Sequence, residues 1–175
     1  MKGRFFTMPE RLPPSDPREW LNRARSCLAI ARCYEPEIYL EDLCFQAQQA
    51  AEKAIKAVFI ARSLPLPYIH DLADLLLRLE KSGLFIPDSI KSASRLNPFA
   101  VHTRYPGFEF PVSADEYHEA LALAESVVRW ADTVIKDTIS RISAFSLSWK
   151  EGNYLEDRHH CRGTAPVCQV RPGLA

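Results

Sequence analysis

The sequence predicts an all-α protein: an up-and-down bundle of about five helices, two long and three shorter, followed by a flexible C-terminal tail. Apolar residues recur three and four positions apart in several separate segments, which is the spacing of one face of an α-helix. No segment of alternating residues is paired with another across a tight turn, so β-hairpins are not expected. The connections between the helical segments are short or moderate, as in an up-and-down bundle.

Two helices near the N-terminus have the clearest apolar pattern. The first begins after Asp16, a residue type that caps helices, and Glu19 is placed to complete a capping box. The second covers residues 40–62 and is rich in alanine, which favours helix and lets another helix approach closely. Pro65 and Pro67 end it, because proline cannot donate a backbone hydrogen bond inside a helix.

Two shorter helices are expected next. The third predicted helix starts near Asp71 and stops at Gly83, the usual residue at a helix C-terminus. The fourth starts at Asp88, which could cap it, and ends or kinks at Pro98. The segment 98–111 contains three prolines and a glycine, so it is predicted to be a loop.

The last predicted helix is long and begins with a capping box, Ser113-Ala-Asp-Glu116. Its apolar periodicity fades at about Ser148, and the remaining residues are polar and interrupted by glycine and proline. The expected organisation is an N-terminal extension over 1–15, a helical bundle over 16–147 and a disordered tail over 148–175.

Composition and motifs exclude several classes of protein. The chain has 22 Lys+Arg and 22 Asp+Glu, a balance that argues against non-specific coating of nucleic acid but leaves room for a small cationic site. No apolar run approaches the roughly 18 residues of a membrane span, and the N-terminus lacks the apolar stretch of a signal peptide. The common phosphate-binding, zinc-protease and serine-hydrolase motifs are absent. We expect a cytoplasmic protein without membrane contact, metal site or cofactor.

One stretch, residues 95–107, gathers side chains suited to phosphate chemistry. Arginine offers a planar fork for phosphate oxygens, here at Arg95 and Arg104. His102 can exchange a proton near neutral pH, and Tyr105 can stack on a base or donate its hydroxyl. Together they would suit a nucleotide or an RNA phosphodiester. The alternative is that both arginines pair with nearby acids and that Tyr105 packs under the loop.

Two further polar positions lie on or beside the predicted helices. His70 directly precedes Asp71, where its ring either hydrogen-bonds locally at the helix entrance or contacts a ligand. Glu52 and Lys53 are interpreted as part of a solvated face of the second helix. Glu52 could pair with Lys56 four residues later, which is worth a few tenths of a kcal/mol (roughly 0.2–0.5) on an exposed helix.

Three stretches together resemble a known family. They are Cys44-Phe-Gln-Ala-Gln-Gln-Ala-Ala-Glu-Lys-Ala-Ile-Lys-Ala-Val58, His70-Asp71-Leu72 and Thr103-Arg104-Tyr105-Pro106-Gly107. The first is similar to the A-x-Q-A-x-E-K-x-L-K-A helix, and the last to the A-R-Y-P turn, of the HEPN domain family (higher eukaryotes and prokaryotes nucleotide-binding). Their order and spacing make the resemblance specific over residues 17–142, within the branch that has an R-Y-P turn before the last helix.

The resemblance implies a helical bundle that is usually a homodimer and often has a nucleotidyltransferase partner encoded nearby. Some members of the family are metal-independent ribonucleases with an R-x₄₋₆-H motif, and six residues separate Arg95 from His102. Others bind nucleotides or RNA without cleaving them, and the R-Y-P form is closer to that branch. The alanine-rich second helix also permits the close packing of a dimer.

Three functions therefore stay open. The favoured one is a nucleotide- or RNA-binding module of a toxin–antitoxin-type system with a nucleotidyltransferase partner, in which Arg104 holds a phosphate, Tyr105 stacks or donates, and His70 lines the same cleft. The alternative is a metal-independent endoribonuclease, in which His102 acts as general base or acid and Arg95 stabilises charge in the transition state. The third is a non-catalytic helical adaptor whose apolar faces pair with another chain.

Overall fold

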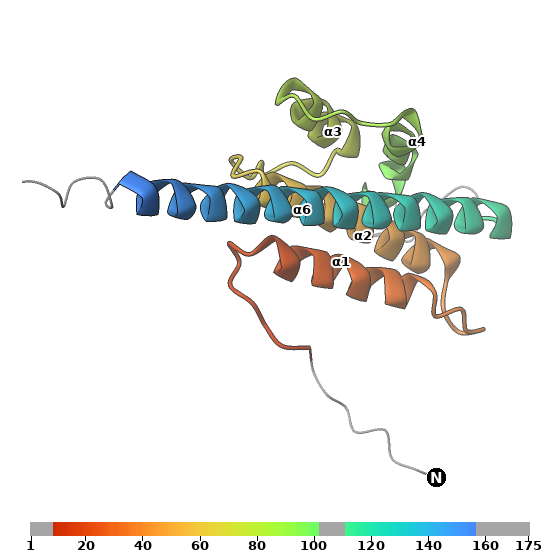
Figure 1. Cartoon of the computed structure of the whole chain (residues 1–175). Helices are drawn as coiled ribbons and strands as arrows, with labels where there is room; N and C mark the ends of the chain where they lie inside the picture. Colours follow the sequence, from red (N-terminus) through yellow and green to blue (C-terminus); the bar gives the residue numbers. More distant parts are fainter. Residues whose placement is uncertain (1–8, 102–110, 157–175) are drawn as a thin grey trace, which may run out of the picture. The chain divides into compact units, whose positions relative to one another are not determined.

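The computed structural model describes residues 9–101 and 111–156, and within these ranges every regular element is helical. Figure 1 shows the elements, which are α1 (Pro17–Ala31), α2 (Leu40–Ala61), α3 (Leu72–Lys81), α4 (Asp88–Lys91), the 3₁₀ helix η1 (Ser92–Leu96), α5 (Pro98–Val101) and α6 (Ala114–Glu156). The predicted all-α class is confirmed, and α2 and α6 are the two long helices. None of the described helices combines the length and hydropathy that a membrane crossing requires.

The chain forms two compact units, divided inside α6. The first unit ends at Ile139 and the second begins at Ser140. The first contains α1 to α5 and the N-terminal part of α6, and it holds all of the buried core described below. The described part of the second unit is the continuation of α6 to Glu156.

The central element of the first unit is α2, which contacts α1, α3, η1 and α5. In Figure 1, α1 runs along α2, while α3 and α4 lie away from α1. Fourteen of the 22 residues of α2 are buried, so this helix has little surface left for solvent. The alanines at 47, 50, 51, 54 and 57 are fully buried, and their small side chains allow the neighbouring backbones to come close.

Asp16 caps the N-terminus of α1 as expected, but Glu19 does not complete the predicted capping box. Asp16 Oδ1 accepts a hydrogen bond from the Arg18 backbone N–H at 2.8 Å. The predicted capping box is wrong, because the Asp16 N–H already donates to the Pro13 carbonyl at 2.9 Å. Glu19 instead accepts a hydrogen bond from the Leu12 N–H at 3.0 Å. It therefore holds the segment before the helix rather than the helix end.

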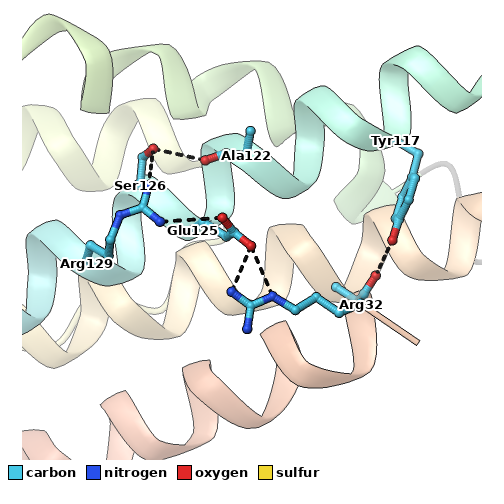
Figure 2. Close-up of polar contacts among 7 residues, drawn as sticks. Arg32, Tyr117, Ala122, Glu125, Ser126 and Arg129 are labelled. Carbon is cyan, nitrogen blue, oxygen red and sulfur yellow. Dashed lines mark hydrogen bonds and ion pairs between the residues drawn. The ribbon is translucent and has the colours of Figure 1, made fainter. Parts of the chain in front are cut away.

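Hydrogen bonds hold the start of α6, both within its first turn and to the end of α1. The predicted capping box is confirmed, because the Ser113 N–H donates to Glu116 Oε2 at 2.8 Å and the Glu116 N–H donates to Ser113 Oγ at 3.3 Å. The buried Tyr117 hydroxyl donates to the Ala31 carbonyl at 2.9 Å, as Figure 2 shows. That carbonyl belongs to the last turn of α1, where backbone acceptors have no partner within the helix.

An ion-pair network extends the contact between α1 and α6 (Figure 2). Arg32 donates to Glu125 Oε1 from Nε at 3.0 Å and from its terminal nitrogen at 2.7 Å. Arg129 also pairs with Glu125, and Ser126 Oγ donates to the Ala122 carbonyl. Arg32 and Arg129 are exposed, so water screens these pairs, and each contributes about 0–1 kcal/mol.

The fourth predicted helix consists of two short elements. Asp88 is the first residue of α4 rather than its cap, and the chain passes into η1 at Ser92. The helix ends at Leu96, just before Pro98 as predicted, but Pro98 begins α5, so the first part of the expected loop is helical as far as Val101. Proline fits this first position because the backbone N–H that it lacks would have no partner within the helix.

The last helix is longer than the apolar pattern indicated. It continues to Glu156, past residue 147 where the bundle was expected to end. Lys150, Glu151 and Leu155 have high helix propensity, but Gly152 lies among them, so propensity alone does not predict this extension. The rest of the predicted tail, from residue 157, lies outside the described residues.

Enlarging an alanine of α2 tests its close packing. Ala54→Leu should lower the free energy of unfolding by about 1–3 kcal/mol, because Ala54 is fully buried and extra methyl groups would displace its neighbours. Ala29→Leu on the exposed side of α1 is the matched control and should change stability by less than about 0.5 kcal/mol. Urea denaturation followed by circular dichroism measures both, and an unchanged midpoint for Ala54→Leu would contradict the packing.

Candidate functional site

A buried ionic cluster lies on α2 and includes a side chain from the segment before α3. Its members are Gln48, Glu52, Lys56 and His70, which we call the Glu52 cluster. Glu52 Oε1 accepts from Lys56 Nζ at 2.9 Å and lies 3.0 Å from His70 Nδ1, and Glu52 Oε2 accepts from Gln48 Nε2 at 3.1 Å. The Glu52 and Lys56 residues are only 5% and 8% exposed. Both oxygens of a buried carboxylate are thus hydrogen-bonded.

Helical spacing brings three members of this cluster together, and a distant segment adds the fourth. Gln48, Glu52 and Lys56 are four residues apart and share one face of α2. The interpretation of Glu52 as part of a solvated face is wrong, because the segment leading into α3 returns along this side of α2 and brings His70 to the carboxylate. The predicted Glu52–Lys56 pair is present, but it is buried.

The cluster keeps its carboxyl group ionised. Burial would raise the pKa of Glu52, but the hydrogen bonds from Lys56, Gln48 and His70 and the charge of Lys56 outweigh this effect and hold the pKa below its usual value. The charges of Glu52 and Lys56 therefore neutralise each other inside the protein. His70 connects this interior to the surface, because its side chain is 70% exposed.

A hydrogen bond joins the segments that carry His70 and Arg95. Asn97 Oδ1 accepts from the Leu72 N–H at 2.9 Å, at the first turn of α3. His70 and Arg95 each lie two residues before one of these partners, so their segments are neighbours in the fold. Asn97 was not among the candidate site residues predicted from the sequence, although an asparagine between a helical segment and Pro98 is a residue type that satisfies free backbone donors.

Arg95 forms an ion pair with Glu119 of α6. This confirms, for Arg95, the alternative that the arginines pair with nearby acids. The two side chains are 61% and 45% exposed, so water screens the pair, and such surface pairs contribute about 0–1 kcal/mol. The guanidinium is therefore held weakly, and the oxygens of a phosphate could replace the carboxylate.

Three of the five residues singled out from the sequence, His102, Arg104 and Tyr105, lie outside the described residues. The structure thus locates His70 and Arg95 and brings their segments together. Among the residues that the structure describes, no group of three or more His, Cys, Asp and Glu side chains is placed to hold a metal ion.

The comparisons with known proteins agree with this helical architecture. A sequence model described as HEPN domain matches residues 17–134, which is more than half of the chain. No curated protein is similar enough to this chain to count as a match.

Several solved structures are similar to this chain, among them the following two. TT1696 from Thermus thermophilus is 30% identical, with a TM-score of 0.62, and the match covers 69% of this chain and 98% of that one. ST0689, described as an archaeal HEPN homologue, is 22% identical, with a TM-score of 0.54, and the match covers 73% of this chain and 99% of that one. The second likeness concerns the fold alone.

Neutralising Glu52 should destabilise the protein. Glu52→Gln should lower the free energy of unfolding by about 3–5 kcal/mol, because it leaves the Lys56 ammonium buried without its counter-charge. The matched control is the double variant Glu52→Gln/Lys56→Met, which removes both charges and should recover most of the loss. Urea titration measures each variant, and equal stability of the single and double variants would contradict a paired buried charge.

The difference in stability between the wild type and Glu52→Gln should depend on pH. The pKa of Glu52 is lowered in the folded state, so its stabilising effect is complete above the usual value of 4.5 and is lost as the pH falls through the folded-state pKa. The stability difference between wild type and Glu52→Gln should therefore shrink from pH 7 to about pH 3. A difference that grows on acidification would show that the sign is wrong.

Proposed function

This chain belongs to the HEPN domain family, and we propose that it binds a nucleotide or RNA at the surface that carries His70 and Arg95. The observation that supports this function most strongly is the Asn97–Leu72 hydrogen bond, because it joins the segments that carry His70 and Arg95. The imidazole of His70 is held by Glu52, and the guanidinium of Arg95 can exchange its carboxylate partner for a phosphate. Arg104 and Tyr105 belong to the same proposed surface on the basis of the R-Y-P turn in the sequence.

Each residue has a distinct task in this proposal. Arg95 exchanges the Glu119 carboxylate for a phosphate, which offers it more charge and a two-oxygen contact. Arg104 holds a phosphate as well, and Tyr105 stacks on a base or donates its hydroxyl. The Glu52 cluster holds His70 in place from inside the bundle.

The proposal includes partner chains. We propose a homodimer and a nucleotidyltransferase partner in a toxin–antitoxin-type system, as the family resemblance implies. Large apolar side chains exposed near the connection between α1 and α2 support an interface with another chain; they are Ile30, Tyr34, Ile38 and Tyr39. The same surface would serve a non-catalytic adaptor, which should gain stability from a partner chain but none from a nucleotide.

Removing the guanidinium of Arg95 tests the binding surface. Arg95→Ala should weaken binding of a fluorescent single-stranded RNA by roughly 10-fold or more and reduce the salt slope of the affinity by about 1, since one phosphate contact is lost. Glu119→Gln should tighten binding, because it removes the carboxylate that competes for Arg95. Fluorescence anisotropy at several salt concentrations measures these changes.

The matched control for this experiment is Arg129→Ala. Arg129 is also exposed and paired with a glutamate, Glu125, but it lies on the part of α6 that packs beside α1. Its removal should leave RNA affinity and salt slope unchanged. If Arg95→Ala and His70→Ala both bind RNA and ATP as tightly as the wild type, the proposed surface is wrong.

A metal-independent endoribonuclease is the second candidate function. The observation that favours it is the run of short helices, because η1 and α5 form a nearly continuous helical path from Arg95 to the residue before His102. In this function, His102 is the general base or acid and Arg95 stabilises the charge that develops on the phosphate.

The ribonuclease function has a direct assay. Total RNA incubated with purified protein in a metal chelator should be cleaved by the wild type and not by His102→Ala, because the variant lacks the group that transfers the proton. His118→Ala, which removes an exposed histidine at the start of α6, is the control and should keep the wild-type rate. Equal cleavage by wild type and His102→Ala would exclude His102 as the catalytic residue.

A further inference from the structure

We propose that Glu52 fixes His70 as a hydrogen-bond acceptor and that His70 thereby recognises the ribose 2′-hydroxyl of the bound nucleotide or RNA. This inference rests on the proposed function, and it adds the sugar that the site selects. It also gives a defined task to His70, which was expected only to line the cleft in which Arg104 holds a phosphate.

The argument begins with the hydrogen-bond capacity of Glu52. An ionised carboxylate can only accept hydrogen bonds, so every neighbour within bonding distance has to donate. Lys56 has only donors. Gln48 turns its NH₂ group to the carboxylate, and its Oε1 accepts a hydrogen bond from Gln49 Nε2 at 2.8 Å. His70 is the remaining neighbour of the carboxylate, and its Nδ1 has to donate too.

This requirement selects one tautomer of the imidazole. A neutral histidine carries a single ring proton, and the contact with Glu52 places it on Nδ1. Nε2 then has a lone pair and no proton. The side chain is 70% exposed, so a ligand can reach the ring while the carboxylate below it is 6% exposed. Neutral His70 thus offers its surroundings a hydrogen-bond acceptor.

An acceptor at Nε2 cannot bind a phosphate oxygen, which is itself an acceptor. The group that approaches neutral His70 must donate, and on a ribonucleotide the sugar hydroxyl is such a donor. The 2′-hydroxyl is the group by which a protein distinguishes RNA from DNA, and it lies next to the 3′-phosphate. Because the Asn97–Leu72 hydrogen bond joins the segments of His70 and Arg95, one nucleotide can place its phosphate at Arg95 and its hydroxyl at His70.

The first test measures the tautomer without any ligand. Long-range proton–nitrogen NMR correlations of the full-length protein at neutral pH should show His70 protonated on Nδ1, with the signal assigned by its loss in His70→Ala. Lys56 and His70 share Glu52 Oε1, so the test uses Glu52→Gln/Lys56→Met, in which no ammonium faces the amide. Its NH₂ group can donate to Nδ1 while its oxygen accepts from Gln48, and the ring proton should move to Nε2. His118, exposed and with its ring tilted by 48° against Tyr117, is the internal reference and should be unchanged in the double variant.

The second test measures sugar selectivity. The wild type should bind a single-stranded RNA roughly 5- to 10-fold more tightly than the DNA of matched sequence, the effect expected of one hydrogen bond, and adenosine 3′-monophosphate more tightly than 2′-deoxyadenosine 3′-monophosphate. Uracil-containing DNA removes the difference in base between the two strands. His70→Ala and Glu52→Gln/Lys56→Met should lose the preference for ribose, while Arg95→Ala should weaken RNA and DNA binding equally.

The outcomes separate this inference from the function on which it rests. Equal affinity of the wild type for RNA and DNA, together with weaker binding by Arg95→Ala, would overturn the role of His70 and leave the binding surface intact. A ring proton on Nε2 in the wild type would overturn the role of Glu52. Absence of binding to every oligonucleotide and nucleotide would overturn the proposed function and the sugar selectivity together.

Discussion

A carboxylate inside a helical bundle is stable only when its charge is balanced and both oxygens are hydrogen-bonded. For Glu52, this constraint determines which side chains surround it on α2 and before α3. Lys56 provides the charge, Gln48 occupies the second oxygen, and His70 completes the set. The first two contacts follow from helical spacing, but the third requires the chain to return to α2 before it begins α3. The path of the chain between α2 and α3 is thus linked to the buried carboxylate of Glu52.

The small side chains of α2 make this arrangement feasible. Fully buried alanines, such as Ala47 and Ala54, let neighbouring helices surround α2. A helix enclosed in this way has little surface for solvent, so the polar residues on its buried faces have to satisfy one another. The close packing and the Glu52 cluster are two results of placing one helix at the centre. Because α2 is at the centre, the buried Glu52 carboxylate also holds the exposed imidazole of His70.

Features that depend on local chemistry could be predicted from the sequence, and features that depend on distant segments could not. The helical periodicities and the Ser113–Glu116 capping box involve residues a few positions apart, and both are present. The capping box expected from Asp16 and Glu19 does not form, because the Pro13 carbonyl accepts the hydrogen bond of the Asp16 N–H. The spacing of residues does not show this competing acceptor. The burial of Glu52 depends on a segment 18 residues away, and a helical wheel cannot show which faces other elements will cover.

The ion pair beneath His70 and the ion pair of Arg95 differ in how readily they exchange partners. The contact between Glu52 and Lys56 lies in the interior, where separating the charges would leave both unpaired at high energetic cost. The pair formed by Arg95 and Glu119 is exposed, and water already screens it. A ligand can therefore compete for Arg95 but cannot rearrange the support beneath His70. On such a surface, attraction to phosphate and selection of the sugar would be separable properties, because they depend on interactions in different dielectric environments.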